Sequence, residues 1–485
     1  FILATFQPHA FQKQVWELAG ENNLFPSLIQ IIDLHRFFGG KDDSAASISA
    51  IVCEIEMAAN RLRSRSPQSS ATRSIIHCAL IVGGGPAGLA AAHRLARLDM
   101  DVVLIEKKDR LGGNLVNIHT PELKQAIEEC LTAVESHSRI TIYKNAEVIG
   151  SSGIPGQFVS RIRLNSDKEI NLGHGVLILA TGGRPSETGH YGLGTHDRII
   201  TQYELEKRIY DPLSLQQQLK SVVMIQCVGS REEPHNYCSR ICCLKSLRNA
   251  LKIKAIHPDA DIYVFYRDMM TYGESEQVYT QARKKGILFI PFNVDTKPKV
   301  KVVAGQPLVE GRDPILGSPV RLKPDLIVLA PGILPNPIGD LARIFNLAIT
   351  RDGFMEEADY KWRPVETDRQ GVFVAGLARG PARVEEAMQE GEAAAGFAFK
   401  FSNREVILSQ RLAARVRHGL CAQCELCLQA CPFRARYVDR QQGQILVDHA
   451  ACQGCGACAA ICPNSATVIG DYEDNGIMDM IEAAL

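Results

Sequence analysis

The stretch that decides the fold runs from Cys78 to Ala96 and reads Cys-Ala-Leu-Ile-Val-Gly-Gly-Gly-Pro-Ala-Gly-Leu-Ala-Ala-Ala-His-Arg-Leu-Ala. The apolar run over 79–82 predicts a buried strand, and apolar residues at helical spacing predict a helix over 89–98. Gly83, Gly85 and Gly88 have the Gly-x-Gly-x-x-Gly spacing between these two elements. A second apolar run over 101–105 predicts another strand.

Each part of this unit has a physical role. Gly83 permits a tight turn, Gly85 lets the backbone approach a pyrophosphate, and Gly88 lets the helix pack closely on the strand. The N-terminus of the helix offers free N–H groups to phosphates. Glu106 follows the second strand, eighteen residues after Gly88, where it can accept hydrogen bonds from ribose hydroxyls. Strand, glycines, helix and acid together predict a dinucleotide site rather than a structural glycine turn.

Composition limits the classes of function. The chain has 485 residues, of which 46% are hydrophobic, and its formal net charge is zero. Such a length suggests about three domains. The balanced charge gives no electrostatic case for nucleic acid or an anionic membrane. No apolar run approaches the roughly 18 residues of a spanning helix, and no stretch has the features of a signal peptide. We expect a cytoplasmic protein whose sequence, starting inside a strand at Phe1, can belong to a longer chain.

The strongest signal is a repeated cysteine spacing near the end of the chain. The motif Cys-x-x-Cys-x-x-Cys-x-x-x-Cys-Pro begins at Cys421 and again at Cys452. This is the spacing of bacterial ferredoxins that hold two clusters, in which the fourth cysteine of each motif binds the other cluster. Zinc sites need neither the third close cysteine nor the proline. We therefore predict two [4Fe–4S] clusters, one held by Cys421, Cys424, Cys427 and Cys462, and the other by Cys452, Cys455, Cys458 and Cys431.

A third group of cysteines has the spacing Cys227-x10-Cys238-x3-Cys242-Cys243. Two adjacent cysteines are awkward ligands for a single zinc ion. Spacing alone leaves three interpretations open: buried structural thiols, a redox disulfide or a metal site. High cysteine content without a signal peptide favours metal binding in a reducing or oxygen-poor cytosol.

The order of predicted strands and helices indicates an α/β protein. A first α/β unit carries the glycine motif, a second begins with the apolar strand Val222–Cys227, and Gly371–Gly376 returns to the flavin-type pattern. We divide the chain into a small N-terminal α/β domain (1–60), a polar linker (61–74), the first part of the dinucleotide-binding domain (75–220), a second α/β domain (221–335), a return segment (336–405), and the ferredoxin domain with a C-terminal helix (406–485).

These motifs, in this order, resemble the A-type subunit (HdrA) of heterodisulfide reductases and its relatives. The residues that carry the resemblance are Gly83–Ala90, Asn145–Ile149, Cys227–Arg231, Tyr237–Cys243, Thr271–Gly273, Gly371–Gly376 and the double ferredoxin motif. The similarity covers about residues 1 to 470. It implies a thioredoxin-reductase-like flavoprotein with two dinucleotide-binding domains and a ferredoxin domain.

The resemblance also implies cofactors and their ligands. It makes Cys227, Cys238, Cys242 and Cys243 ligands of a third [4Fe–4S] cluster, near an FAD. No residue is expected to act as a catalytic acid, base or nucleophile. The residues expected to contact FAD are Gly83, Gly85, Pro86, Ala87, Gly88, Glu106, Lys107, Gly112, Gly113, Asn114, Val148, Ala180, Thr181, Gly182, Gly376, Gly380 and Val384.

Three departures from the family pattern are informative. Phe6 stands where the N-terminal domain usually has a cysteine, and His35-Arg-Phe-Phe also lacks one, so we expect no cluster there. The ferredoxin insertion of some longer members is absent. Ala382-Arg383 stands where Lys-Asp is frequent after Gly380-Pro381. That lysine could tune the flavin potential. Because it is absent from this sequence, electron bifurcation does not follow from the resemblance.

The expected function is an electron-transfer subunit of an anaerobic oxidoreductase, with HdrB/HdrC-like, MvhD-like or other electron-transfer partners and a homodimer within the complex. It would serve the reduction of a disulfide, or of a low-potential acceptor such as an aromatic acyl-CoA. One alternative is an NAD(P)H-dependent, glutamate-synthase-like diaphorase, which needs a second glycine loop where only Gly229 is found. Another is an assembly subunit whose FAD is structural.

Overall fold

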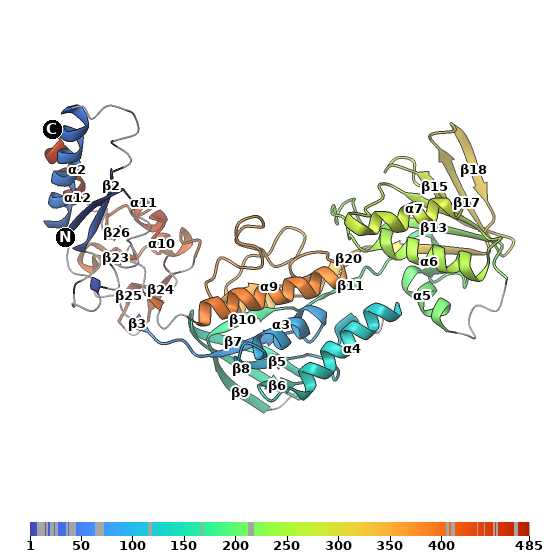
Figure 1. Cartoon of the computed structure of the whole chain (residues 1–485), viewed down its shortest axis with the longest axis horizontal. Helices are drawn as coiled ribbons and strands as arrows, with labels where there is room; N and C mark the ends of the chain where they lie inside the picture. The colour runs from blue at the N-terminus through green and yellow to red at the C-terminus, as the bar shows by residue number, and fades with distance from the viewer. Residues whose placement is uncertain are drawn as a thin grey trace. The chain divides into compact units, whose positions relative to one another are not determined.

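The computed structural model divides the chain into two compact units (Figure 1). The larger unit comprises residues 76–403, and the smaller one comprises 1–75 together with 404–485. The structure describes residues 1–6, 28–34, 45–63, 72–114, 119–165, 168–211, 218–403, 413–433, 435–440, 442–449, 454–469 and 474–484, with a few single residues and two pairs between these ranges.

The first half of the larger unit is built on a parallel five-stranded sheet of order β21-β10-β4-β5-β6. Its strands are β4 (Cys78–Val82), β5 (Asp101–Ile105), β6 (Ile140–Tyr143), β10 (Val176–Leu179) and β21 (Val372–Val374). Helix α3 (Pro86–Ala96) packs against both α4 (Pro121–Ser136) and α9 (Val384–Ser402). The close approach of α9 to α3 depends on Gly391, where an added Cβ would stand 2.1 Å from the carbonyl oxygen of Ala87.

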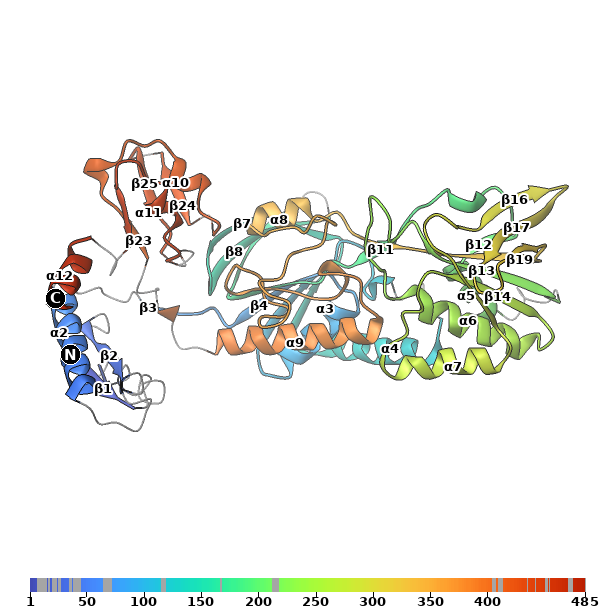
Figure 2. The same cartoon turned by 90° about the horizontal axis from the view of Figure 1, so that it is seen from above.

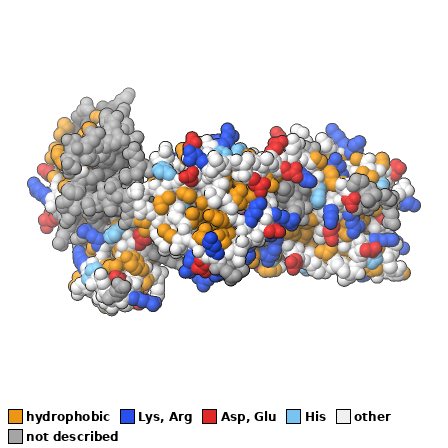
Figure 3. Space-filling view, turned by 90° about the horizontal axis from the view of Figure 1, so that it is seen from below, with side chains coloured by type: hydrophobic (Ala, Val, Ile, Leu, Met, Phe, Trp, Pro, Cys, Tyr) orange, Lys and Arg blue, Asp and Glu red, His pale blue; other side chains and the backbone are white. Residues whose placement is uncertain are grey.

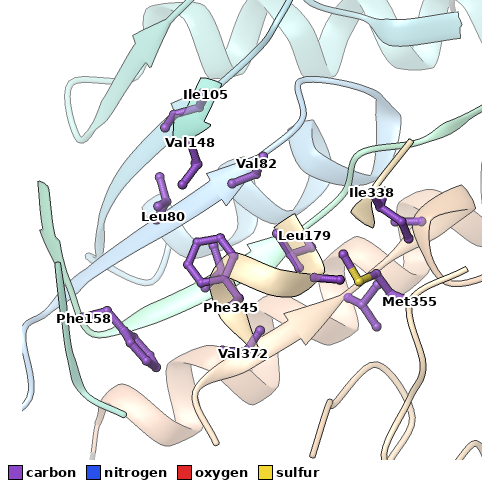
Figure 4. Packing of buried hydrophobic residues seen from close by; sticks show 14 of the residues in the cluster. Leu80, Val82, Ile105, Val148, Phe158, Leu179, Ile338, Phe345, Met355 and Val372 are labelled. Atoms are coloured by element: carbon purple, nitrogen blue, oxygen red, sulfur yellow. The ribbon is translucent and has the colours of Figure 1, made fainter. Parts of the chain in front are cut away.

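An antiparallel layer packs against this sheet. Its strands are β7 (Ala146–Ile154), β8 (Gln157–Leu164) and β9 (Lys168–His174). Phe158 of β8 lies in the shared core with Leu80 and with Phe345, the last residue of helix α8 (Gly339–Phe345) (Figure 4). Phe158, Leu80 and Phe345 have no exposed surface, and burial of a side chain of this size contributes about 1.5 to 3 kcal/mol. This packing holds the strands of the parallel sheet, and therefore their carboxyl ends, in place.

The second half of the larger unit repeats the parallel architecture. Its sheet has the order β12-β19-β13-β14-β15, and an antiparallel pair, β11 with β20, joins the two halves. The bounds are β11 (Gly183–Pro185), β12 (Ile199–Thr201), β13 (Ser221–Val228), β14 (Asp261–Tyr266), β15 (Leu288–Pro291), β19 (Leu326–Pro331), β20 (Ile333–Pro335), α5 (Gln202–Tyr210), α6 (Cys242–Ile256) and α7 (Glu276–Lys284). Residues 222–225 are fully buried, as a strand covered on both faces requires.

A three-stranded antiparallel sheet completes this half and consists of β16 (Lys299–Val303), β17 (Gln306–Asp313) and β18 (Ser318–Leu322). It was not expected from the sequence, because its exposed residues, such as Val302 and Val303, do not form a buried apolar run. Basic and acidic side chains are interspersed over the face shown in Figure 3.

The smaller unit contains the cysteine motifs (Figure 2). Each motif carries one short helix, α10 (Leu426–Gln429) or α11 (Ala457–Ala460), and each is followed by a strand, β24 (Arg436–Asp439) or β26 (Thr467–Ile469). Strand β23 (Ala414–Val416) pairs with β26, and β24 pairs with β25 (Gln444–Val447). The remainder includes β1 (Ile2–Thr5) parallel to β2 (Gln30–Asp33), the pair β3 (Thr72–Arg73) and β22 (Ile407–Leu408), and α2 (Ala45–Arg63) packed against α12 (Asp474–Ala484).

The predicted fold class is confirmed: two parallel dinucleotide-binding-type sheets in one unit and a double-motif cysteine module in the other. Helix α2 begins at Ala45 and continues to Arg63, into the predicted linker. The polar stretch 64–70, most of 7–27, and His35 and Arg36 lie outside the described residues. Within the described part of the chain, no helix has the length and apolarity needed to cross a bilayer.

Candidate cofactor sites

A pocket in the larger unit lies at the carboxyl ends of β4, β10 and β21, where ligands bind in open parallel sheets. It brings together segments that are far apart in the sequence. The predicted contact residues that line it are Gly83, Gly85, Pro86, Ala87, Glu106, Gly113, Asn114, Ala180, Thr181, Gly182, Gly376 and Val384.

Among the three glycines of the motif, only Gly85 has free space beside it, and this is where a cofactor needs space. A Cβ on Gly83, whose φ is +112°, would stand 2.2 Å from the carbonyl oxygen of Ala180, and one on Gly88 would stand 1.9 Å from that of Gly83. These two glycines are required by packing. A Cβ on Gly85 would meet nothing nearer than the Gly113 Cα, 3.9 Å away. The space at Gly85, beside the N-terminus of α3, therefore fits a pyrophosphate.

Glu106 is fixed at the end of β5 and is only 9% exposed. Its two carboxylate oxygens accept hydrogen bonds from the backbone N–H groups of Gly84 and Lys108, each at 2.8 Å. The carboxylate thus braces the glycine turn. Because each carboxylate oxygen accepts more than one hydrogen bond, Glu106 can still accept from a ribose hydroxyl.

Thr181 gives a second sign that the pocket suits a polar ligand. Its hydroxyl is buried and has no hydrogen-bond partner in the described part of the chain, although Thr181 lines the pocket. A buried polar atom without a partner costs about 1 to 3 kcal/mol. Asn336 holds the neighbouring backbone, since its side-chain nitrogen donates to the carbonyl oxygen of Thr181 at 2.7 Å. A dinucleotide with polar edges fits this position.

Five predicted contacts lie outside the pocket lining: Gly88, Lys107, Gly112, Val148 and Gly380. Gly88 serves the packing of α3, and Gly112 supports the turn because its N–H donates to the carbonyl oxygen of Gly84 at 2.7 Å. Val148 belongs to the apolar core. Lys107 is largely exposed, with its Nζ 3.6 Å from Glu147, and the neighbouring Lys108 lines the pocket instead.

Sequence reasoning missed the side of the pocket formed by the second half of the unit. Glu206 of α5 and Lys245 of α6 line it as a buried ion pair. Glu206 also accepts from the backbone N–H of His119 at 2.9 Å, and the Lys245 Nζ lies 4.3 Å from the ring centroid of Tyr203. Burial lowers the pKa of Lys245, while Glu206 opposes this shift. No local motif signals this pair, because its partners are 39 residues apart.

The third group of cysteines comes together at the end of β13 and the start of α6. Cys227 occupies a left-handed conformation with φ +57°. Cys242 is close enough to interact electrostatically with Cys243, Cys227 and Cys238. Burial raises the pKa of the Cys243 thiol to about 12, and Cys227 and Cys238 also act to raise it. A bound metal would reverse this shift, because it stabilises thiolates directly.

This group adjoins the pocket. Cys242 and Cys243 stand between Ile241 and Leu244 in the chain, and both of these neighbours line the pocket. The backbone N–H of Arg240 donates to the Cys238 sulfur at 3.3 Å. The start of α6 is thus shared by the pocket and the cysteines.

One small pocket brings together cysteines of both ferredoxin motifs. It is lined by Cys421, Cys424 and Cys427 of the first motif and by Cys462 of the second. Cys452, Cys458 and Cys431 of the other predicted set belong to one apolar cluster, against which Cys427 of the first set also packs, whereas Cys455 is exposed.

Backbone N–H groups support these sulfurs. Those of Ala435 and Ala466 donate to Cys431 and Cys462, each at 3.2 Å. In the described residues, no group of three or more His, Cys, Asp or Glu side chains is arranged around a single ion. Four cysteines on separate corners of a cubane stand farther apart than the ligands of one ion, so the two arrangements differ.

Two family models match separate parts of the chain. Residues 81–140 match the family model of the NAD(P)-binding Rossmann-like domain. Residues 414–463 match the 4Fe-4S dicluster domain, and this range contains all eight cysteines of the two motifs.

Curated relatives are similar over most of the chain. Methanopyrus kandleri has two A-type iron-sulfur subunits of CoB–CoM heterodisulfide reductase; the one numbered 2 is 25% identical, over 92% of this chain and 83% of its own. The one numbered 1 is 35% identical, over 66% and 51%. The A-type subunit of the H2:CoB–CoM heterodisulfide,ferredoxin reductase of Methanothermobacter marburgensis is 29% identical, over 81% and 74%. Among solved structures, thioredoxin reductase of T. acidophilum aligns with 67% of this chain and 99% of its own at 16% identity and a TM-score of 0.44.

Proposed function

Since this chain belongs to the heterodisulfide reductase HdrA family, we propose that it is an electron-transfer flavoprotein subunit. In this proposal FAD lies in the pocket at the carboxyl ends of β4, β10 and β21. Three [4Fe–4S] clusters receive or supply its electrons. The relatives named above are subunits of oxidoreductases, and this chain is likewise part of an oxidoreductase.

The single observation that carries the proposal is the shared start of α6. Ile241 and Leu244 line the pocket, and the two cysteines between them belong to the group with Cys227 and Cys238. FAD accepts an electron pair and can release single electrons, whereas each cluster carries one electron at a time. The cysteines would therefore hold the first electron acceptor or donor directly beside the flavin.

The residues of the pocket supply position and electrostatics. Gly85 and the N-terminus of α3 would hold the pyrophosphate, and Glu106 the ribose. The buried hydroxyl of Thr181 would find its missing partner on the cofactor. The Glu206–Lys245 pair closes the pocket from the second half of the unit and presents a cation to it.

The ferredoxin module would exchange electrons with partner proteins. Cys424 and Cys455 are both exposed, so each proposed cluster has a ligand at the surface where a partner can approach. We propose HdrB/HdrC-like or MvhD-like electron-transfer proteins as partners, within a complex that contains two copies of this chain in the cytoplasm. The terminal step would be reduction of a disulfide or of a low-potential acceptor such as an aromatic acyl-CoA. Electron bifurcation at the flavin is one way in which the low-potential electrons for this step would be provided.

The test is the cofactor content of the full chain, reconstituted without oxygen. We expect one FAD and, for three [4Fe–4S] clusters, about twelve irons per chain. Cys242→Ala should lose about a third of the iron and keep its FAD. Cys130→Ala is the matched control, because Cys130 is a partly buried cysteine of α4 that belongs to none of the three sets. Full iron content in Cys242→Ala would contradict the third cluster, and loss of iron in both variants would mark a folding defect.

A further inference from the structure

The two cysteine motifs place different residues at equivalent positions. Arg436 follows Cys431 by five residues, and Thr467 follows Cys462 by five residues. Each begins a strand, β24 or β26, and each is only 5% exposed. The module thus offers an internal comparison between a buried cation and a neutral hydroxyl at one site.

Arg436 is directed at a cysteine of the second motif. Its Nη2 lies 3.1 Å from the Cys458 sulfur, and its Nη1 is buried without a partner in the described residues. Burying a guanidinium is costly unless a negative charge compensates it. A neutral thiol does not supply that charge, whereas cysteine thiolates of a bound cluster do. The position of Arg436 therefore points to a negatively charged occupant beside Cys458.

Thr467 stands at the other set of cysteines. It lines the small pocket formed by Cys421, Cys424, Cys427 and Cys462. Its hydroxyl is hydrogen-bonded to the Cys462 sulfur. This contact adds a dipole but no charge, so at this position the first set has a neutral hydroxyl where the second has a buried cation.

We infer that Arg436 sets the order of the two ferredoxin clusters. It raises the reduction potential of the cluster held by Cys452, Cys455, Cys458 and Cys431 above that of the cluster held by Cys421, Cys424, Cys427 and Cys462. The inference rests on the proposed cluster assignment and deepens it. It predicts which of the two clusters holds the electron when the module carries only one.

The physical reason is the charge that reduction adds. Each transfer oxidises one cluster by one electron and reduces the other by one electron, and no bond forms or breaks. The reduced cluster carries one more negative charge, so an adjacent cation and a hydrogen bond to its sulfur stabilise it. Arg436 also interacts with Cys427 of the first set, but its hydrogen bond is made to Cys458. We therefore expect both potentials to respond, and that of the Cys458 cluster to respond more.

The test is a redox titration of the full chain, followed by electron paramagnetic resonance without oxygen. Replacing Cys424 or Cys455 with Ser assigns each signal to its cluster, since each variant alters one ligand set. In wild type we expect the Cys458 cluster to be reduced first. Arg436→Met should shift the distribution of one electron between the clusters at least tenfold toward the Cys421 cluster, which corresponds to about 59 mV.

The controls separate charge from structure. Arg436→Lys keeps a cation and should restore most of the wild-type difference, whereas Thr467→Val, at the equivalent position, should leave the order of the clusters unchanged. If Arg436→Met fails to load iron, Arg436→Gln carries the same test. Unchanged potentials in an iron-loaded Met or Gln variant would overturn the role of Arg436. Absence of iron from the wild-type module would instead overturn the cluster assignment itself.

Discussion

The Nη2 of Arg240 lies 2.9 Å from the phenolic oxygen of Tyr272 and 3.3 Å from the carboxylate of Glu386. Arg240 stands between Cys238 and Cys242, and Glu386 lies in the first turn of α9, whose first residue lines the pocket. The Nη1 of Arg240 also donates to the carbonyl oxygen of Pro381 at 3.3 Å. These contacts hold the segment between Cys238 and Cys242 against the edge of the proposed flavin site.

The first prediction concerns these hydrogen bonds of Arg240. Arg240→Met removes charge-assisted hydrogen bonds, each worth about 1.5 to 3 kcal/mol. We expect retained FAD and iron, but slower electron transfer between flavin and the neighbouring cluster, measured by rapid mixing. Arg343→Met is the matched control, because Arg343 is exposed and its ion pair is with the exposed Asp340. Equal transfer rates in wild type and Arg240→Met would show that the contacts do not position the cysteines.

The second prediction uses two glycines of the same helix. Gly391→Ala places a Cβ 2.1 Å from the Ala87 carbonyl oxygen, so α9 must move away from α3. We expect a loss of stability of about 1 to 3 kcal/mol and weaker FAD retention. At Gly396 an added Cβ meets nothing within 4 Å, and Gly396→Ala should stabilise by about 0.5 to 1 kcal/mol. Denaturant unfolding compares the two, and similar effects of both substitutions would contradict the proposed close packing.

The third prediction concerns pH. Burial lowers the pKa of His174 to about 4, although its ring nitrogen bonds the carbonyl oxygen of Val176 and thereby opposes the shift. Above the ordinary pKa of about 6.5, both the folded and the unfolded state carry a neutral ring. Between about pH 6.5 and 4 the unfolded chain binds a proton that the folded chain does not, so the free energy of unfolding falls as pH falls.

Integrated over that window, the loss is on the order of 3 kcal/mol, and it is complete below about pH 4. The measurement is urea unfolding at several pH values in wild type and in His174→Gln. The variant should be less stable at neutral pH, because Ser160 loses its partner at 2.8 Å, but its stability should fall less steeply with acid. Parallel pH profiles would contradict the assignment.

The fourth prediction concerns nicotinamide nucleotides. A phosphate cradle requires glycines that let the backbone approach closely. At the end of β13 the chain instead has Cys227, and Gly229 is the lone glycine between β13 and Arg231. We expect that neither NADH nor NADPH reduces the flavin of this chain when other flavoproteins of the complex are absent. Rapid bleaching of the flavin by either nucleotide would instead support the diaphorase alternative.

The features that could be predicted from sequence are those whose chemistry is local. The glycine turn, the strands beside it and both cysteine motifs depend on residues within a few positions of one another. The Glu206–Lys245 pair and the contact of Arg436 with Cys458 could not be predicted, because each joins segments that meet only through tertiary packing. Helix α5 was also missed, although Thr201 and Glu204 form a capping box at its start, because its 3.6-residue apolar pattern is short and mostly polar.

In the proposed route, electrons move between the flavin and the ferredoxin pair through the cluster of Cys227, Cys238, Cys242 and Cys243. The most direct measurement is photoreduction of the flavin in the reconstituted chain, with samples frozen at intervals for electron paramagnetic resonance. The account predicts that cluster signals grow as the flavin is reoxidised in wild type and in Cys130→Ala. In Cys242→Ala the flavin should stay reduced and the ferredoxin signals should stay small. Ferredoxin signals that grow at the wild-type rate in Cys242→Ala, with its FAD and remaining iron intact, would contradict the claim.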